Sequence, residues 1–208
     1  MKLNINSPVF QFLNTFTEFV LLNAVFLITC IPLITIGASI TALYTVTLRE
    51  ARGEEGYLVH SYWKAFLENF RKSTLLFLVY FASGCVLLFN LVFWLQMQTP
   101  AGNLLLTGIC LLSLLWLVSL LYVFPLQARF ENSLSQTLRN ALLLALSNRL
   151  CTVVILLLFL AAAALFCLTS VFRLFLLVFG FAFLAYCNSF FFLKVFRKYE
   201  PEQQTPEF

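Results

Sequence analysis

The sequence predicts an all-α polytopic membrane protein, a bundle of about five membrane-spanning helices with two amphipathic helices on its cytoplasmic side. Of its 208 residues, 62% are hydrophobic and 11% are charged, and the mean hydropathy is +0.94, outside the range of soluble domains. Several uncharged windows reach the ~20 residues that a helix needs to cross the hydrocarbon layer. These windows are continuously apolar and lack the alternation of a membrane β-barrel. Contact with the lipid bilayer is therefore the first expected interaction.

The first apolar window is too long for one straight helix. No residue from Phe19 to Leu48 is charged, and a helix of that length measures about 45 Å. Pro32 removes a backbone donor and Gly37 allows the chain to turn. We therefore expect the first span to be broken at Pro32 and Gly37, with one helix over about 17–36 and a second helical piece over about 38–52.

Small and hydroxyl-bearing residues follow this proline. Thr35, Ser39 and Thr41 can hydrogen-bond to backbone groups that the break leaves free. The run P-L-I-T-I-G-A-S-I-T-A-L-Y, residues 32–44, resembles the signature of the YesL-like bacterial membrane proteins, a family known as a domain of unknown function. The run W-K-A-F-L-E-N-F-R-K, residues 63–72, resembles the next block of the same family. The motif residues singled out at the break are Pro32, Thr35, Gly37, Thr41 and Tyr44.

The resemblance implies a multi-pass protein of five or six helices in the bacterial cytoplasmic membrane. Such proteins are often encoded beside carbohydrate uptake and degradation systems, which implies a role near those systems. Their activity is unassigned, so no catalytic residue is carried over to this chain.

Residues 57–72 show the period of an amphipathic helix, with aromatic and aliphatic residues on one side and charged residues on the other. We expect this helix to lie at the cytoplasmic membrane surface. Aromatic residues and arginine are typical interface anchors, so it is also a candidate docking surface. The alternative is that its aromatic side packs on the protein's own spans. The candidate docking residues are Tyr62, Trp63, Lys64, Phe66, Glu68 and Arg71.

The remaining spans are expected over 74–95, 104–124, 150–172 and 174–193, with the second basic amphipathic helix over about 126–149. Residues 1–200 then form a single membrane domain. The polar residues 201–208 are expected to be a disordered tail.

Basic residues set the predicted orientation. The 49–72 link contains five, the 125–149 link three and the C-terminal segment three, whereas the 96–103 link contains none. The basic segments should face the cytoplasm. Five spans then place the N-terminus outside, and a re-entering piece at 38–52 places it inside.

Nothing in the sequence has the pattern of a catalytic or metal site, so we expect neither an enzyme nor a cofactor or metal. The six cysteines lie in or beside apolar windows with no close pair, and there is one histidine. Ionisable and amide groups at membrane depth are functional candidates by default, although those near helix ends also serve as interfacial anchors. The intramembrane polar candidates are Glu18, Asn23, Asn90, Arg173 and Asn188.

Two functions remain open. An accessory component of carbohydrate uptake or sensing, working with an uptake permease or a sensor kinase, agrees with the family resemblance and the large apolar surface. The alternative is an independent carrier of a sugar-related small molecule that uses the broken helix; a membrane enzyme is a third and weaker reading. The net charge of +4 lies in segments that flank the spans, so no nucleic-acid partner is expected. The sequence sets neither a sugar nor an oligomeric state.

Overall fold

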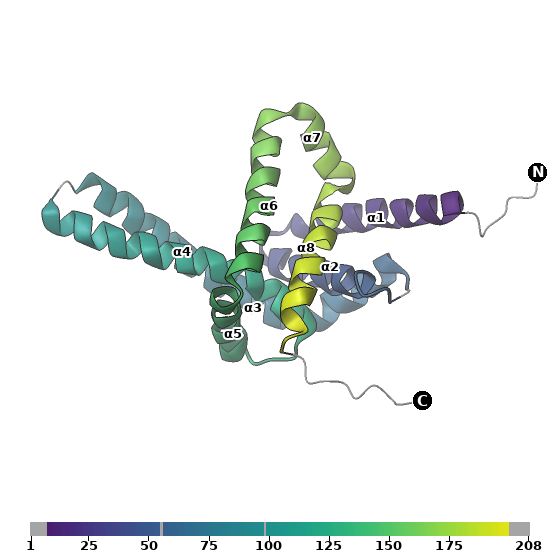
Figure 1. The fold of residues 1–208 in the computed structure, drawn as a ribbon, viewed down its shortest axis with the longest axis horizontal. Helices are drawn as coiled ribbons and strands as arrows, with labels where there is room; N and C mark the ends of the chain where they lie inside the picture. The colour runs from purple at the N-terminus through teal and green to yellow at the C-terminus, as the bar shows by residue number, and fades with distance from the viewer. Residues whose placement is uncertain (1–7, 55, 98, 200–208) are drawn as a thin grey trace, which may run out of the picture.

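The fold was analysed in a computed structural model, which describes residues 8–54, 56–97 and 99–199; the tail at 201–208 lies outside these ranges. The described residues form helices and no strand, which confirms the all-α class (Figure 1). The elements are α1 (Pro8–Cys30), η1 (Leu33–Thr35), α2 (Ile36–Glu50), α3 (Leu58–Gln96), α4 (Pro100–Arg129), α5 (Leu134–Ser147), α6 (Arg149–Leu168), α7 (Ser170–Phe175), η2 (Leu176–Gly180) and α8 (Phe181–Phe196).

Five helical stretches of the described chain are long and apolar enough to cross a membrane, as the sequence predicted. Little of their most apolar parts is buried inside the protein, from 6% to 28% of each stretch. Such surfaces require an apolar environment, so the helices contact the lipid bilayer. The stretches are Leu13–Cys30, Leu58–Gln96, Pro100–Arg129, Arg149–Leu168 and Ser170–Phe196.

The break in the first window is present, but it lies earlier than expected. The α1 helix ends at Cys30, Pro32 is extended (φ −73°, ψ 124°), and α2 begins at Ile36 after one 3-10 turn. Proline disfavours helical geometry at the residue before it and supplies no N–H, so the chain leaves the helix at Ile31. Gly37 is therefore not part of the turn but lies in the first turn of α2.

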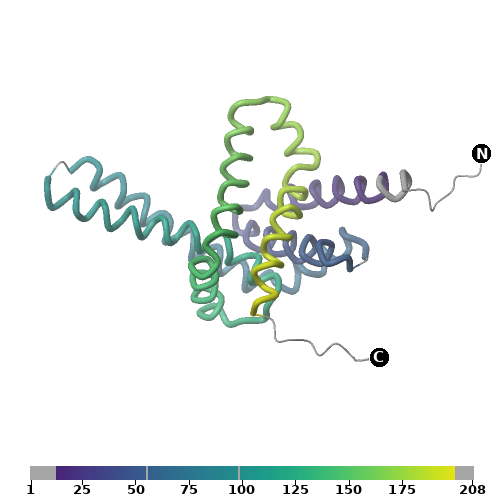
Figure 2. The backbone as a smooth tube through the Cα atoms, viewed as in Figure 1, coloured from purple at the N-terminus to yellow at the C-terminus, as the bar shows by residue number. Residues whose placement is uncertain are grey.

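After the break, α2 runs back beside α1, and the two form a hairpin (Figures 1 and 2). Burial, and next to it the negative charge of Glu18 on α1, raise the pKa of Glu50 at the end of α2. The middle of α1 and the end of α2 thus lie near each other. A hairpin of this kind is what the re-entering alternative requires, and the side of the membrane on which the N-terminus lies stays a prediction.

The amphipathic segment at 57–72 is not a separate helix, contrary to the expectation. It is the first part of α3, a single helix of 39 residues that measures about 58 Å at the usual helical rise. No glycine or proline occurs between Leu58 and Ser83, so nothing ends the helix before the apolar span begins. The amphipathic segment and the span are consequently one continuous helix.

The second amphipathic helix is shorter than the predicted 126–149. The α4 helix continues through Pro125 to Arg129, and α5 starts only at Leu134. A capping box fixes that start: the Ser133 hydroxyl accepts from the Gln136 N–H at 3.4 Å, and the Gln136 side chain accepts from the Ser133 N–H at 3.1 Å.

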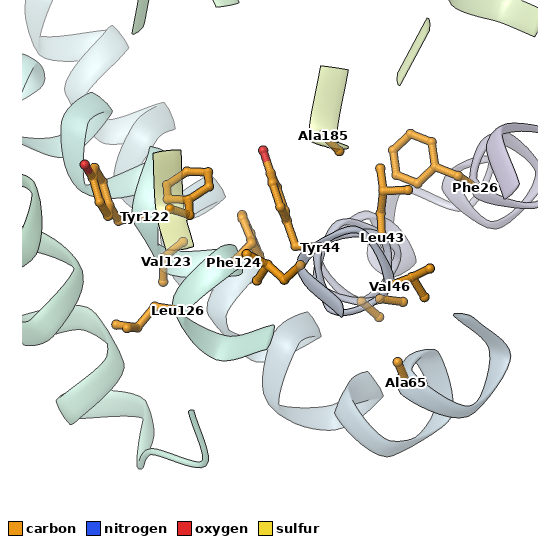
Figure 3. Packing of buried hydrophobic residues seen from close by; sticks show 14 of the residues in the cluster. Phe26, Leu43, Tyr44, Val46, Ala65, Tyr122, Val123, Phe124, Leu126 and Ala185 are labelled. Carbon is orange, nitrogen blue, oxygen red and sulfur yellow. The ribbon is translucent and has the colours of Figure 1, made fainter. Parts of the chain in front are cut away.

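Two long hairpins leave the core in different directions (Figure 1). One is α3–α4, and the other is α6 with α7, η2 and α8. The core lies where they diverge, around α2, of whose 15 residues ten are buried. Figure 3 shows side chains of α1, α2, α4 and α8 meeting there, among them Phe26, Tyr44, Phe124 and Ala185.

The α1–α2 hairpin predicts the side on which the N-terminal end of α1 lies. In a cysteine-free background, Asn14→Cys and Glu54→Cys should react with a membrane-impermeant maleimide only from the cytoplasmic side, because the 49–72 link is basic. Asn103→Cys, in the first turn of α4 next to the uncharged connection from α3, should react only from outside. Labelling of Asn14→Cys and Glu54→Cys from opposite sides would contradict the hairpin.

Candidate functional site

Hydroxyl groups satisfy the backbone at the α1–α2 break. The Thr35 hydroxyl donates to the carbonyl of Thr29 (2.6 Å), near the end of α1, and to that of Pro32 (2.7 Å), which also accepts the Thr35 N–H at 3.1 Å. The Thr29 hydroxyl shares a hydrogen bond with the hydroxyl of Tyr62 on α3. The break is therefore anchored to the start of α3, and water is not needed to solvate its carbonyls.

Gly37 provides a close approach between α2 and α3. A Cβ atom at this position would lie 2.4 Å from the Ser73 carbonyl oxygen and 2.6 Å from the Phe77 Cβ. The backbones of the two helices are thus closer than any side chain at position 37 permits. Within the same helix, the Thr41 hydroxyl donates to the Gly37 carbonyl at 2.9 Å, so this buried hydroxyl is satisfied.

An apolar chamber of about 440 Å³ lies at the base of the diverging hairpins. We call it the core chamber. Six elements contribute aromatic walls, and none of the lining residues carries a charge. Its volume is within the roughly 300–1,000 Å³ typical of small-molecule sites. One aromatic residue from each element is Phe26 (α1), Tyr44 (α2), Tyr80 (α3), Trp116 (α4), Phe159 (α6) and Phe181 (α8).

Two polar side chains have no hydrogen-bond partner among the described residues: Tyr44, which lines this chamber, and Asn188, which does not line it. The Tyr44 ring extends from α2 to α8, where it meets Phe192 edge-on at 5.5 Å, and its hydroxyl stays unbonded (Figure 3). Asn188 on α8 is fully buried, and both its amide nitrogen and its amide oxygen lack a partner. Asn188 lies one turn beyond Ala185, which lines the chamber.

A second cavity of about 590 Å³ lies between α3, α4 and α5. Tyr80 and Trp116 line both cavities, so they form the wall between them. Each is fixed by a hydroxyl: Tyr80 shares a hydrogen bond with Ser119, and the Trp116 indole N–H donates to Ser83 at 2.9 Å. The sequence analysis missed this wall. In the sequence, only the serines within two otherwise apolar spans indicate that polar side chains could be paired there.

Asn23 is the predicted polar residue with the clearest structural role. Its amide nitrogen donates to the carbonyls of Leu176 (3.2 Å) and Leu177 (2.8 Å), and its amide oxygen accepts from the Ala182 N–H at 3.0 Å. These groups flank the π-helical turn η2, where the regular helical pattern is interrupted. Asn23 therefore joins α1 to the α6–α8 hairpin and satisfies the irregular backbone.

The other polar candidates are separated from the core chamber. Arg173 donates to the carbonyls of Phe166 (2.8 Å) and Cys167 (3.1 Å), so it caps the end of α6 at the tip of the hairpin. Asn90 donates to Val86 on its own helix at 2.8 Å. The Glu18 carboxylate accepts from Asn14 at 3.5 Å, near the first turns of α1.

The candidate docking residues divide between two faces of α3. Tyr62 is fully buried and Phe66 is 8% exposed, so these two rings pack on the protein's own core. Trp63 is 44% exposed, and Lys64, Glu68 and Arg71 are also exposed. Only part of the predicted surface is thus available to a partner.

The described residues contain no group of three or more His, Cys, Asp or Glu side chains placed to hold a metal ion. The chamber itself is lined by apolar side chains, with two tyrosines and one tryptophan as the only lining residues that carry a hydroxyl or an indole N–H. A sugar carries many hydroxyls that each need a partner once buried. The arrangement suits an apolar ligand with a small polar group better than a sugar.

The fold defines a multi-pass α-helical membrane protein. Residues 19–91 match the family model described as "Protein of unknown function, DUF624", so this segment is similar to that family. The matched segment runs from α1 through the break and α2 into the span part of α3, so it contains the motif residues at the break. No curated protein and no solved structure matches the chain.

The close approach at Gly37 predicts a strong effect of one methyl group. Gly37→Ala should destabilise the protein by about 1–3 kcal/mol, because the added Cβ meets the backbone of α3. The matched control is Gly108→Ala on α4, where a Cβ meets nothing within 4 Å; its stability should equal or exceed that of the parent. Apparent melting temperatures in detergent measure both. Equal melting temperatures for the two variants would show that α2 and α3 do not pack at Gly37.

Proposed function

We propose that the chain is a non-catalytic accessory subunit of a carbohydrate uptake or sensing system in the bacterial cytoplasmic membrane. The YesL-like resemblance suggests the process, and the exposed face at the start of α3 suggests how the chain acts. That face is formed by Trp63, Leu67 and Phe70, which recur at helical spacing beyond the most apolar part of the helix. We call it the docking face.

The rings of the docking face are held in place by buried neighbours. Trp63 meets Phe66 edge-on at 5.8 Å, and Phe66 meets Phe70 edge-on at 5.5 Å. Phe66 itself is buried in the core. Because the exposed rings are already ordered, a partner that covers them loses little side-chain entropy on binding. Aromatic anchors of this kind dominate the affinity of many protein interfaces.

Charged side chains beside the docking face can set the orientation of a bound partner. Lys64, Glu68 and Arg71 are exposed, and none of them forms an ion pair within the described chain. A mixed-sign set of this kind favours one orientation of a complementary partner. We propose that this partner is an uptake permease or a sensor kinase in the same membrane.

An independent sugar carrier is less well supported. A carrier needs polar groups along a pathway for its substrate, and the core chamber is lined by apolar side chains. Of the three Asn residues that a pathway could use, Asn23 and Asn90 are bonded to backbone carbonyls, and Asn188 is fully buried without a partner.

Changing the charges of the docking face tests the proposal. The combined variant Lys64→Ala, Glu68→Ala, Arg71→Ala should fold as the parent does, because all three side chains are exposed. It should lose about tenfold or more in recovery of the partner after purification in mild detergent, since several interface contacts are removed together. It should also reduce growth on the sugar whose uptake depends on this protein.

The control changes exposed charges elsewhere on the cytoplasmic side. Arg139→Gln with Arg149→Gln, on α5 and α6, should leave partner recovery and growth unchanged. The proposal is wrong if deletion of the protein impairs growth on a sugar while the triple variant supports growth and partner recovery as the parent does.

A further inference from the structure

A pocket with polar side chains lies where α4, α5 and the end of α8 meet. Figure 1 shows the end of α8 beside the link between α4 and α5, and the pocket between them has a volume of about 360 Å³. We call it the polar pocket, and its size is within the roughly 300–1,000 Å³ typical of small-molecule sites. The lining residues that could recognise a ligand are Phe130, Asn132, Asn140, Phe196 and Tyr199.

Two amide side chains that line the polar pocket are not used by the fold. Asn132 lies in the α4–α5 link and Asn140 lies on α5, and both are half-buried. Neither side chain has a hydrogen-bond partner among the described residues. Each amide has one acceptor oxygen and two donor hydrogens, and the hydroxyl of Tyr199 adds a further donor. The pocket therefore offers both donors and acceptors to a bound molecule.

The backbone and the rings around these groups are held in place. The Asn132 N–H donates to the Phe130 carbonyl at 3.0 Å, and the capping box of α5 begins at the next residue. Phe130 meets Phe196 edge-on at 5.5 Å. The Tyr199 hydroxyl accepts from the Asn148 amide at 3.4 Å, so its own hydrogen can point elsewhere. Because the lining is ordered before a ligand arrives, binding costs little side-chain entropy.

The lining restricts the chemistry of the ligand. No charged side chain is among the described residues that line the polar pocket, so an ionised group would be buried there without a counter-charge. The faces of aromatic rings are negatively polarised and attract C–H groups, whereas the two amides match neighbouring hydroxyls. A sugar ring carries both kinds of group. The polar pocket thus has the hydrogen-bonding side chains that the core chamber lacks.

We propose that the polar pocket binds an uncharged monosaccharide, with hydroxyls bonded to Asn132, Asn140 and Tyr199 and C–H groups against Phe130 and Phe196. The basic segments that form the pocket are predicted to face the cytoplasm, so the sugar comes from that side. Binding itself depends only on the pocket. Its use as a signal to the partner of the docking face rests on the proposed accessory function.

Binding is measured by saturation-transfer NMR on the purified protein in phosphatidylcholine nanodiscs, titrated with glucose, galactose and xylose. At least one sugar should bind with a Kd of about 1 mM or below, as expected for a few hydrogen bonds with ring contacts. Cyclohexanol, a six-membered ring with one hydroxyl, should bind about tenfold more weakly or worse. The proposal is overturned if none of the three sugars binds, or if cyclohexanol binds as tightly as they do.

Two variants place the sugar in the polar pocket. Asn132→Ala and Asn140→Ala should each weaken binding about tenfold, because each removes the hydrogen bonds of one amide. Their melting temperatures should match the parent's, since neither side chain has a partner in the described chain. The matched control is Asn103→Ala, an exposed asparagine in the first turn of α4 that also lacks a side-chain partner, and it should bind the sugar as the parent does. Unchanged binding in both pocket variants would contradict the site.

These titrations contain no partner protein, so they are independent of the docking face. Sugar binding together with partner recovery that the docking-face variant does not reduce would contradict the accessory function alone. Partner recovery that depends on the docking face, in a protein that binds none of the sugars, would contradict the polar pocket alone.

Discussion

Backbone satisfaction inside an apolar environment is the constraint on which this structure depends. In lipid, a carbonyl or N–H that loses its helical partner must find another within the protein. The described chain interrupts its helices inside apolar stretches at Pro32 and at the π-helical turn η2, and in both places a side chain hydrogen-bonds to the backbone groups of the interruption. Thr35 accounts for the carbonyls of Thr29 and Pro32, and Asn23 accounts for those of Leu176 and Leu177. At the first interruption Thr29 also bonds to Tyr62 on α3, and at the second Asn23 on α1 bonds to η2, so each interruption is also a contact between two elements.

These contacts place α2 at the centre. A helix of 15 residues is too short to span a bilayer by itself, yet α2 touches α1, α3, α4 and α8 through its buried residues. Its serine and threonine hydroxyls donate to carbonyls of the preceding turn, which allows a helix of low hydrophobicity to be buried. With α2 filling the base, the two long hairpins diverge above it and leave the core chamber between them.

The sequence predicted the helical class, the number of spans and the existence of the break, because apolar length and proline act locally. It misplaced the role of Gly37, since a close approach to Ser73 depends on a helix that is distant in sequence. It also separated 57–72 from the following span, because a change from amphipathic to apolar pattern was taken as a boundary where no residue ends the helix. Asn23 and Asn188 were indistinguishable in the sequence, and only their neighbours show that one is satisfied and the other is not.

The uninterrupted α3 helix connects the docking face to the wall of the core chamber. Trp63 and Phe70 of the docking face and Phe77 and Tyr80 of the chamber wall lie on one helix, with Ser73 between them. At Ser73 the helix is held against Gly37 with no space for an added methyl group. A helix fixed at that point and unbroken on both sides cannot move at its N-terminal end without shifting the chamber wall, because packed interiors have little free volume to absorb the displacement. The contact between Gly37 and Ser73 therefore fixes the position of the docking face relative to the wall of the core chamber.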